Sequence, residues 1–251
     1  MVICVPLPTE RPASPRHRDS SALPLHEVQY RVVGSFESRF KAFRLVYDTY
    51  IQRGLIRENH FRLRVTPFHL IPTTEMFAAE YDGEIICTLT LIGDGSAGLP
   101  LEIIYGDEVK ELRLQEIPIG EVSCLAAKNL EPSQFFTIFS ELTRLMAQYA
   151  RARGLHQLLA AVHPKHAKFY QKFLGFQQIG PEKCYPCVEH APAVACCLDF
   201  ERIDRDRPKC YDNYFGTAIP QLQLQPCPMP PFEADFFTAA ADLANTCLPL
   251  G

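Results

Sequence analysis

The stretch IPIGEVSCLAA, residues 117–127, reads as one buried strand with a carboxylate, Glu121, in its middle. Apolar residues stand on both sides of Glu121, a pattern typical of a strand that is buried on both faces. Burying an ionised carboxylate without a partner costs on the order of several kcal/mol. Glu121 is therefore expected either to form an ion pair or to take part in chemistry, and the neighbouring segments bear on that choice.

A long helix is predicted directly after this strand, over residues 132–153, because Pro132 suits a first helical turn and Gly154 follows as a stop. The apolar side chains at helical spacing are Phe135, Phe139, Leu142, Met146 and Tyr149.

The remaining segments predict further strands and helices around this pair. Alternating or buried patterns predict strands at residues 27–33, 75–81, 84–93, 156–163, 176–180 and 193–200. Helical patterns follow Ser35 and Pro164, and a shorter one lies in the insert at residues 94–116. This order indicates an α/β (α+β) protein with one mixed sheet of about six to seven strands flanked by helices.

Composition divides the chain into three parts. Residues 1–25 are rich in Pro, Ser and Arg and predict a disordered leader. Residues 26–200 form the regular domain, and residues 201–251 form a Pro-rich extension with one short amphipathic helix within residues 232–245.

Charge and cysteine content narrow the class of protein. A net charge of −4 argues against nucleic acid as a partner, and no apolar run reaches the length of a transmembrane segment. The start of the chain does not resemble a signal peptide, so the ten cysteines are expected to be reduced thiols. We expect a cytoplasmic protein.

The element order and several motifs resemble the Gcn5-related N-acyltransferase (GNAT) fold. The closer resemblance is to the FeeM-like N-acyl amino acid synthases and the related acyl-homoserine lactone synthases. The residues that carry it are RLVYDTYIQRGLI (44–56), GLPLEIIYGDEVKELR (98–113), IGEVSCLAA (119–127), HPKHAKFYQKFLGF (163–176) and APAVACCLDF (191–200). The resemblance makes residues 26–200 a GNAT-like acyltransferase domain.

In this fold the acyl donor lies in a gap where two central strands splay apart, and the resemblance assigns these strands to residues 117–126 and 157–162. A splayed strand leaves backbone amides without sheet partners, and the Leu125 amide is the candidate donor to the thioester carbonyl. The residues expected to contact the acyl-pantetheine arm are Ser123, Cys124, Ala126 and His163.

Two functional groups are candidates for proton transfer. Aminolysis of a thioester needs a neutral amine, and Glu121 with a raised pKa could remove the amine proton. The alternative is that Glu121 forms a structural ion pair with Arg44 or Arg113. Tyr170 stands where related acyltransferases protonate the leaving thiolate, although an aromatic at this spacing could equally be a core residue. His163 is expected to cap the helix that starts at Pro164.

The segment after the Glu121 strand, AAKNLEPSQ (126–134), lacks the glycine-rich loop with which coenzyme A-dependent relatives bind pyrophosphate. A phosphopantetheine arm on an acyl carrier protein therefore fits better as the donor, and no permanently bound cofactor is expected. Carrier proteins are acidic, and Lys165, Lys168 and Lys172 on one helix face could dock one; the alternative is an ordinary solvated face.

The acceptor implied by the resemblance is an amino acid, whose carboxylate could bind Arg113 or Arg44. The homoserine lactone relatives carry Arg where this chain has Cys124, and they use a Trp that this chain lacks, which disfavours homoserine lactone synthesis. The motif KCYPCVEH (183–190) contains a CxxC without a second pair at suitable spacing, so no metal site is expected.

The sequence therefore predicts an N-acyltransferase that moves a long-chain acyl group from acyl carrier protein to the α-amino group of an amino acid. Two alternatives stay open at this point. One is an acyl-CoA-dependent enzyme that acts on a small amine, and the other is a non-catalytic module that binds acyl chains or carrier protein.

Overall fold

The computed structural model describes residues 2–3 and 23–241. Its strands are β1 (Val2–Ile3), β2 (Gln29–Val32), β3 (Thr74–Tyr81), β4 (Glu84–Gly93), β5 (Ile119–Ala127), β6 (Gln157–Val162), β7 (Gln177–Gln178), β8 (Lys183–Tyr185) and β9 (Ala191–Asp199). Its α-helices are α1 (Phe36–Gln52), α2 (Glu102–Leu114), α3 (Pro132–Ala152), α4 (Pro164–Phe173), α5 (Phe200–Asp206), α6 (Tyr211–Phe215) and α7 (Pro231–Ala239). Short 3-10 turns are η1 (Leu25–Glu27), η2 (Pro67–Leu70), η3 (Pro186–Val188) and η4 (Gln221–Leu224).

The described strands form a mixed sheet with the order β2-β3-β4-β5-β6-β9-β7, to which β1 adds beside β6 and β8 beside β9. Strands β2 to β5 are antiparallel, β5 and β6 are parallel, and β9 is antiparallel to both β6 and β7. The α/β class with one mixed sheet is thus confirmed. Strand β8 is an element that the sequence did not predict.

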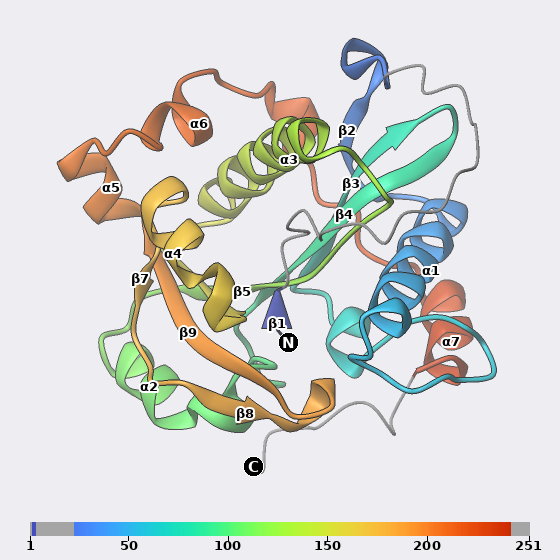
Figure 1. Cartoon of the computed structure of the whole chain (residues 1–251), viewed down its shortest axis with the longest axis horizontal. Coiled ribbons are helices and arrows are strands. Elements are labelled where there is room, and N and C mark those ends of the chain that lie inside the picture. Colours follow the sequence, from blue (N-terminus) through green and yellow to red (C-terminus); the bar gives the residue numbers. More distant parts are fainter. Residues whose placement is uncertain (1, 4–22, 242–251) are drawn as a thin grey trace, which may run out of the picture.

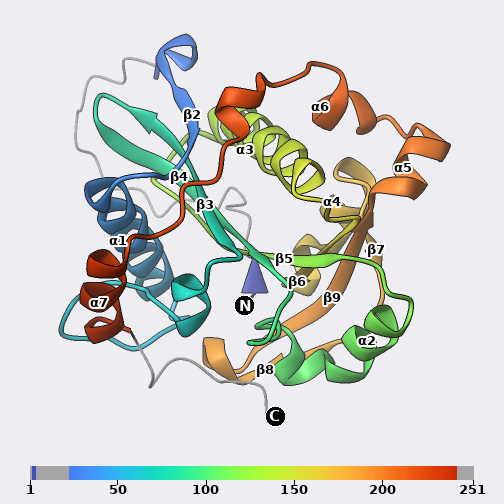
Figure 2. The same ribbon diagram turned by 180° about the vertical axis from the view of Figure 1, so that it is seen from behind.

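Helices cover both faces of this sheet, and Figures 1 and 2 show α1 and α3 on opposite sides of the β3–β4 hairpin. Two hydrophobic clusters fill the two layers. One packs α3, α4 and α6 against the sheet, and the other packs α1, α2 and α7 against its opposite face. Within the described residues, no helix is both long and apolar enough to cross a membrane.

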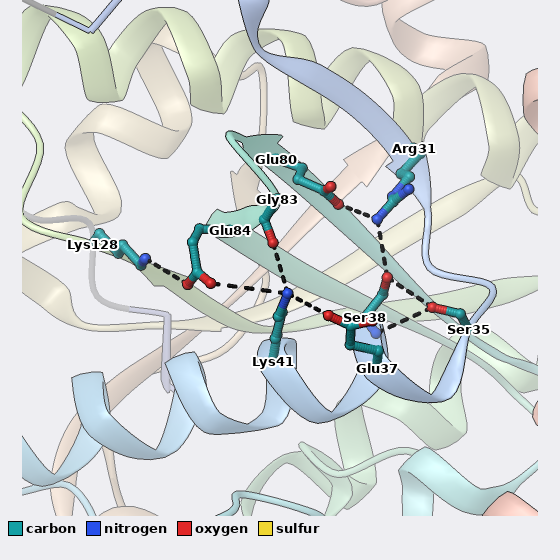
Figure 3. Close-up of polar contacts among 9 residues, drawn as sticks. All are labelled: Arg31, Ser35, Glu37, Ser38, Lys41, Glu80, Gly83, Glu84 and Lys128. Atoms are coloured by element: carbon teal, nitrogen blue, oxygen red, sulfur yellow. Dashed lines mark hydrogen bonds and ion pairs between the residues drawn. The ribbon is translucent and has the colours of Figure 1, made fainter.

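The start of α1 is fixed to the hairpin by a polar network (Figure 3). Ser35 caps the helix by accepting from the Ser38 amide, as its sequence position predicted. Lys41 donates to Glu37 and to the Gly83 carbonyl in the β3–β4 turn. This network sets the position of α1 above the face of the sheet that carries Glu121.

Strands β5 and β6 diverge after a short paired segment. Residues 119–121 of β5 pair with residues 157–159 of β6, and the last pair is Glu121 with Leu159. Beyond that point β6 pairs instead with β1, at Ala161 and Val162, while its other edge remains on β9. Figure 2 shows β1 beside the two diverging strands.

A β-bulge in β5 accompanies the divergence. The register against β4 shifts by one residue between the pairs Thr90–Ser123 and Thr88–Ala126. Cys124 lies in this shift with a positive φ of 53°, which is unusual for a residue with a side chain. The bulge directs Ser123 and Cys124 toward the same, α1-covered face.

The two ends of the chain differ in part from the predicted division. Val2 and Ile3 form a strand of the sheet rather than part of a disordered leader, and residues 4–22 lie outside the described part. The C-terminal extension carries most of α5 together with α6 and α7 rather than one helix, and the segment from 242 onward is likewise outside the described residues.

Candidate active site

Glu121 lies at the last position where β5 and β6 pair, and its side chain is fully buried. Its Oε2 accepts a hydrogen bond of 2.7 Å from the Leu101 amide, directly before helix α2. Burial raises the pKa of the Glu121 carboxyl, and the Leu101 amide opposes this effect. A buried carboxyl group with a raised pKa at a strand divergence is a candidate proton acceptor.

The insert before α2 is folded so that its backbone reaches Glu121. Gly98 adopts a positive φ of 68°, and the Leu99 amide donates to Glu102 Oε1 at 2.6 Å. The Tyr185 hydroxyl donates to the Pro100 carbonyl at 2.7 Å and fixes the insert to β8. The folded insert thus places the Leu101 amide against the Glu121 carboxylate.

The two arginines considered as ion-pair partners of Glu121 are engaged elsewhere. Arg113 donates to both oxygens of Asp94 at 2.7 Å and also to both oxygens of Glu102. Arg44 pairs with Asp48 on the outer face of α1. The proposed structural ion pair with either arginine is not formed, and neither arginine presents its guanidinium to Glu121.

Three of the four residues expected to line the donor arm lie along β5 after the divergence, and the fourth, His163, follows β6. Ser123 and Cys124 are fully buried on the face of Glu121, whereas Leu125 packs into the cluster of α3 and α4 on the other face. Ala126 belongs to the α1 cluster. Beyond Glu121, this edge of β5 does not pair with β6, and strand β1 contacts β5 there.

A buried histidine that sequence reasoning missed lies against Cys124. His69 Nε2 is 3.3 Å from Cys124 Sγ, and His69 Nδ1 accepts from the Thr66 amide at 3.0 Å. Because Nδ1 is an acceptor, the proton of the neutral ring is on Nε2, which donates to the sulfur. The signal in the sequence is Thr66-Pro67 followed by His69, which forms a capping box at η2.

This tautomer decides what Cys124 can do. A base that activates a thiol must accept its proton, but His69 Nε2 already carries one. Burial lowers the pKa of His69 to about 3 and raises the pKa of Cys124 to about 11. Both groups are neutral at pH 7, so the pair is a polar contact rather than a nucleophilic dyad.

The candidate residues on α4 are placed by the end of β6. His163 caps α4, with its Nδ1 accepting from the Lys165 amide at 3.2 Å, as predicted. Tyr170 is buried in the α3–α4 cluster and packs edge-on against Phe176. Glu121 and Tyr170 therefore lie on opposite faces of the sheet. His166, on the same helix, is also buried.

The three lysines proposed for docking lie exposed along α4 and form no ion pair within the described residues. Beside them, Phe136 of α3 and Phe173 of α4 are exposed, and both rings pack against the ring of Phe169. This surface of α3 and α4 therefore combines positive charge with exposed aromatic rings.

The N-terminus of α3, which follows β5, offers little to a pyrophosphate. Glu131 is its N-cap residue, Pro132 has no N–H, and Gln134 Oε1 accepts the Glu131 amide at 3.2 Å. At the other end of the domain, Cys184 and Cys187 lie at β8 and η3. No group of three or more potential metal ligands is found in the part of the chain that is described.

Comparisons with known proteins identify the family to which the chain belongs. The profile of the family described as N-acyl amino acid synthase FeeM matches residues 41–199, which is more than half of the chain. A sequence search among curated proteins gives no match.

Several solved structures have folds similar to that of this chain. FeeM, an N-acyl amino acid synthase from uncultured soil microbes, shares 28% identity with a TM-score of 0.63, over 74% of this chain and 97% of FeeM. The AHL synthase LasI shares 15% identity with a TM-score of 0.57, over 77% of this chain and 96% of LasI. The CoA-dependent acyl-homoserine lactone synthase MesI shares 15% identity with a TM-score of 0.50, over 76% of this chain and 97% of MesI. From the family match and the FeeM-like fold together, the chain belongs to the FeeM family of N-acyl amino acid synthases, which is related to the GNAT acyltransferases.

Proposed function

We propose that this protein transfers a long-chain acyl group from an acyl carrier protein thioester to the α-amino group of an amino acid. The observation that carries the proposal is the divergence of β5 and β6 at Glu121, a buried carboxyl group with a raised pKa. This arrangement supplies both a place for an extended thioester arm and a proton acceptor beside it.

The reaction assigns one role to each candidate group. The neutral amine nitrogen attacks the thioester carbonyl carbon, and its proton passes to Glu121, directly or through water. The Leu125 amide is the candidate donor to the carbonyl oxygen as negative charge develops there. The C–S bond then breaks as the C–N bond persists, and Tyr170 is the candidate that returns a proton to the departing thiolate.

Acyl carrier protein is favoured as the donor by two features. The N-terminus of α3 carries Glu131 and Pro132 where a pyrophosphate of coenzyme A would need amide donors and no negative charge. The exposed Lys165, Lys168 and Lys172, next to Phe136 and Phe173, suit an acidic partner with apolar contacts. MesI, which is described as CoA-dependent, shows that this fold also occurs with the other donor.

An amino acid is favoured as the acceptor because the matching family is described as N-acyl amino acid synthases. The proposal also keeps the cytoplasmic location that the sequence predicted.

The decisive experiment incubates the purified protein with palmitoyl-acyl carrier protein and an equimolar mixture of the twenty amino acids, and identifies products by mass spectrometry. An N-palmitoyl amino acid and free carrier thiol are expected. Parallel reactions contain palmitoyl-CoA at the same concentration. A faster reaction with palmitoyl-CoA would overturn the carrier-protein donor, and binding of palmitoyl-acyl carrier protein without any amide product would favour the non-catalytic module.

A further inference from the structure

A single peptide group connects strand β8 with Glu121. The Pro100 carbonyl accepts a hydrogen bond of 2.7 Å from the Tyr185 hydroxyl, and the Leu101 amide donates one of 2.7 Å to Glu121 Oε2. This carbonyl and this amide belong to the same planar peptide group. The Tyr185 and Glu121 side chains are 1% and 0% exposed, so both hydrogen bonds are shielded from water.

This geometry couples the Tyr185 hydroxyl to the Glu121 carboxylate. Because the peptide group is planar, turning its carbonyl away from Tyr185 would also turn the Leu101 N–H away from Glu121. A hydrogen bond accepted by the carbonyl also polarises the peptide group and makes its N–H a stronger donor. Tyr185 therefore both orients the Leu101 amide and strengthens its hydrogen bond.

Several influences act together on the Glu121 carboxyl. Burial raises its pKa, the charge of the chain's amino terminus and the Leu101 hydrogen bond lower it, and the Glu102 carboxylate raises it. The neighbouring Cys124 thiol is neutral at pH 7, since its pKa is raised to about 11 by burial. Of these influences, the Leu101 hydrogen bond is the one that passes through the Tyr185 contact.

Strand β8 is held against the start of α2 by further contacts, and Figures 1 and 2 show the two elements side by side. The Tyr105 hydroxyl lies 2.8 Å from the Pro181 carbonyl and 2.7 Å from the Ala193 carbonyl, between the two sides of the β8–β9 hairpin. Lys183 of β8 donates to the Ile104 carbonyl at 2.8 Å. These contacts hold the hairpin and the first turn of α2 together.

Helix α2 is interrupted at Tyr105, whose φ of −125° and ψ of 35° are not helical. The Tyr105 amide nevertheless donates to the Leu101 carbonyl at 2.9 Å. Gly180 allows the ring to approach, because a Cβ at this position would lie 2.8 Å from two ring carbons of Tyr105. The kink separates the turn that carries Leu101 from the rest of α2, so the position of this turn depends on its contacts with the hairpin.

Building on the proposed function, in which Glu121 is the base, we propose that Tyr185 is a positioning residue that acts on Glu121 through the Pro100–Leu101 peptide group. Tyr105 supports it by holding the same turn of α2 against the β8–β9 hairpin. Removing the Tyr185 hydroxyl weakens the Leu101 hydrogen bond, which stabilises the carboxylate form, so the pKa of Glu121 should rise. Because a base acts in its deprotonated form, the acid limb of the activity profile should move to higher pH.

The test compares Tyr185→Phe with Tyr214→Phe. The control removes another buried hydroxyl, which donates to the Leu174 carbonyl at 3.0 Å in the hydrophobic cluster on the opposite face of the sheet. The first measurement needs no turnover. It is a pH titration of the Glu121 carboxyl carbon by NMR in protein labelled with ¹³C-glutamate, in which Glu121→Gln identifies the signal.

Tyr185→Phe should raise the titration midpoint of Glu121 by about 0.5 pH unit or more, and Tyr214→Phe should leave it unchanged. The acid limb of the kcat/KM profile should shift by the same amount. Tyr105→Phe should shift the midpoint in the same direction, and an unchanged midpoint there would overturn the supporting role of Tyr105. An unchanged midpoint in Tyr185→Phe, or an equal shift in Tyr214→Phe, would overturn the assignment of Tyr185.

Hydrogen exchange in the wild type covers the case in which Tyr185→Phe does not fold. The Leu101 amide should exchange about as slowly as the hydrogen-bonded amides of β8, because the same opening exposes both. Exchange at Leu101 that is faster by about 10²-fold or more would overturn the coupling. A shift of the NMR midpoint without a shift of the acid limb would remove Glu121 as the base, and with it that part of the proposed function, while the link between Tyr185 and Glu121 would stand.

Discussion

The carboxylate of Glu121 accepts a 2.7 Å hydrogen bond from the amide of Leu101, so the candidate base is positioned by the N-terminal end of helix α2. Backbone amides at a helix start favour a negative charge, while burial disfavours it, and burial dominates here. The base is therefore tuned by a segment that lies about twenty residues earlier in the chain.

Replacing Glu121 by Gln should lower kcat by about 10²-fold or more, because the amide cannot accept the amine proton. The Leu101 hydrogen bond can be kept by the Gln carbonyl, so the melting temperature should change little. Steady-state kinetics with acyl carrier protein thioester measure the effect. Glu75→Gln, at another buried carboxylate, is the matched control and should keep at least half of the activity. Near-normal turnover in Glu121→Gln would assign Glu121 a structural role.

Replacing Tyr170 by Phe should lower kcat by about 10-fold while leaving the KM for the thioester unchanged, because only the proton of the hydroxyl is lost. The ring packing against Phe176 is kept, so folding is preserved. With a thioester whose leaving thiol is more acidic, the difference in kcat between Tyr170→Phe and the wild type should be smaller. If Tyr170→Phe has wild-type kcat with both donors, Tyr170 is a core residue only.

Replacing Lys165, Lys168 and Lys172 together by Glu should raise the KM for acyl carrier protein thioester by about 10-fold or more at low salt. The kinetics with a free acyl-pantetheine thioester should not change, since that donor has no protein surface. Increasing ionic strength should raise the KM of the wild type for this thioester toward the KM of the variant. Lys110→Glu with Lys209→Glu, on exposed positions elsewhere, serves as the control. An equal rise in KM in the α4 variant and in the control variant would show a general effect of charge rather than docking at α4.

Strand β1 pairs with β6 where the proposed thioester arm would lie. Replacing Val2 and Ile3 by Pro removes both backbone donors and should weaken this pairing. We expect the KM for the thioester to fall several-fold, with kcat unchanged. A chain with Ala at both positions keeps the donors and is the control. A higher KM in the Pro variant would mean that β1 builds the donor site rather than occupying it.

His69 predicts a specific dependence of stability on pH. Its pKa is about 3 in the folded protein and 6.5 in the unfolded chain, so the unfolded state takes up the proton first as pH falls. The stabilisation is complete above pH 6.5 and is lost below it, at up to about 1.4 kcal/mol per pH unit for one proton. Urea unfolding from pH 7 to 5 should show a shallower loss in His69→Gln than in the wild type. His60→Gln, at an exposed position, should keep the wild-type slope.

The sequence predicted the main elements because their signals are local. The apolar periodicity of α3, the strands predicted at residues 75–81 and 84–93 and the Ser35 cap all appear at the expected positions. The short strands β1 and β8 were missed, since two or three residues carry no periodicity and are defined only by pairing with distant strands.

The site was predictable only in part, for a related reason. Glu121 stands out because a carboxylate within an apolar strand is visible in the sequence. His69 does not stand out, because its burial arises from the fold of an irregular segment against α1 and β5. Arg113 was a candidate because it is a cation in the insert motif, but its partners Asp94 and Glu102 become neighbours only after folding.

The C-terminal segment ends in a contact with the first helix that has a practical consequence. Arg39 is buried and donates to Glu233 of α7 at 2.6 Å and to the Cys227 carbonyl at 2.5 Å. A recombinant fragment that stops at residue 200 would lose both acceptors of Arg39 and would also expose the rings of Phe36 and Phe43, which pack against Phe237 of α7. Minimal expression boundaries drawn from the family match alone would thus yield a poorly behaved protein, and crystallisation or screening work should begin from the intact polypeptide.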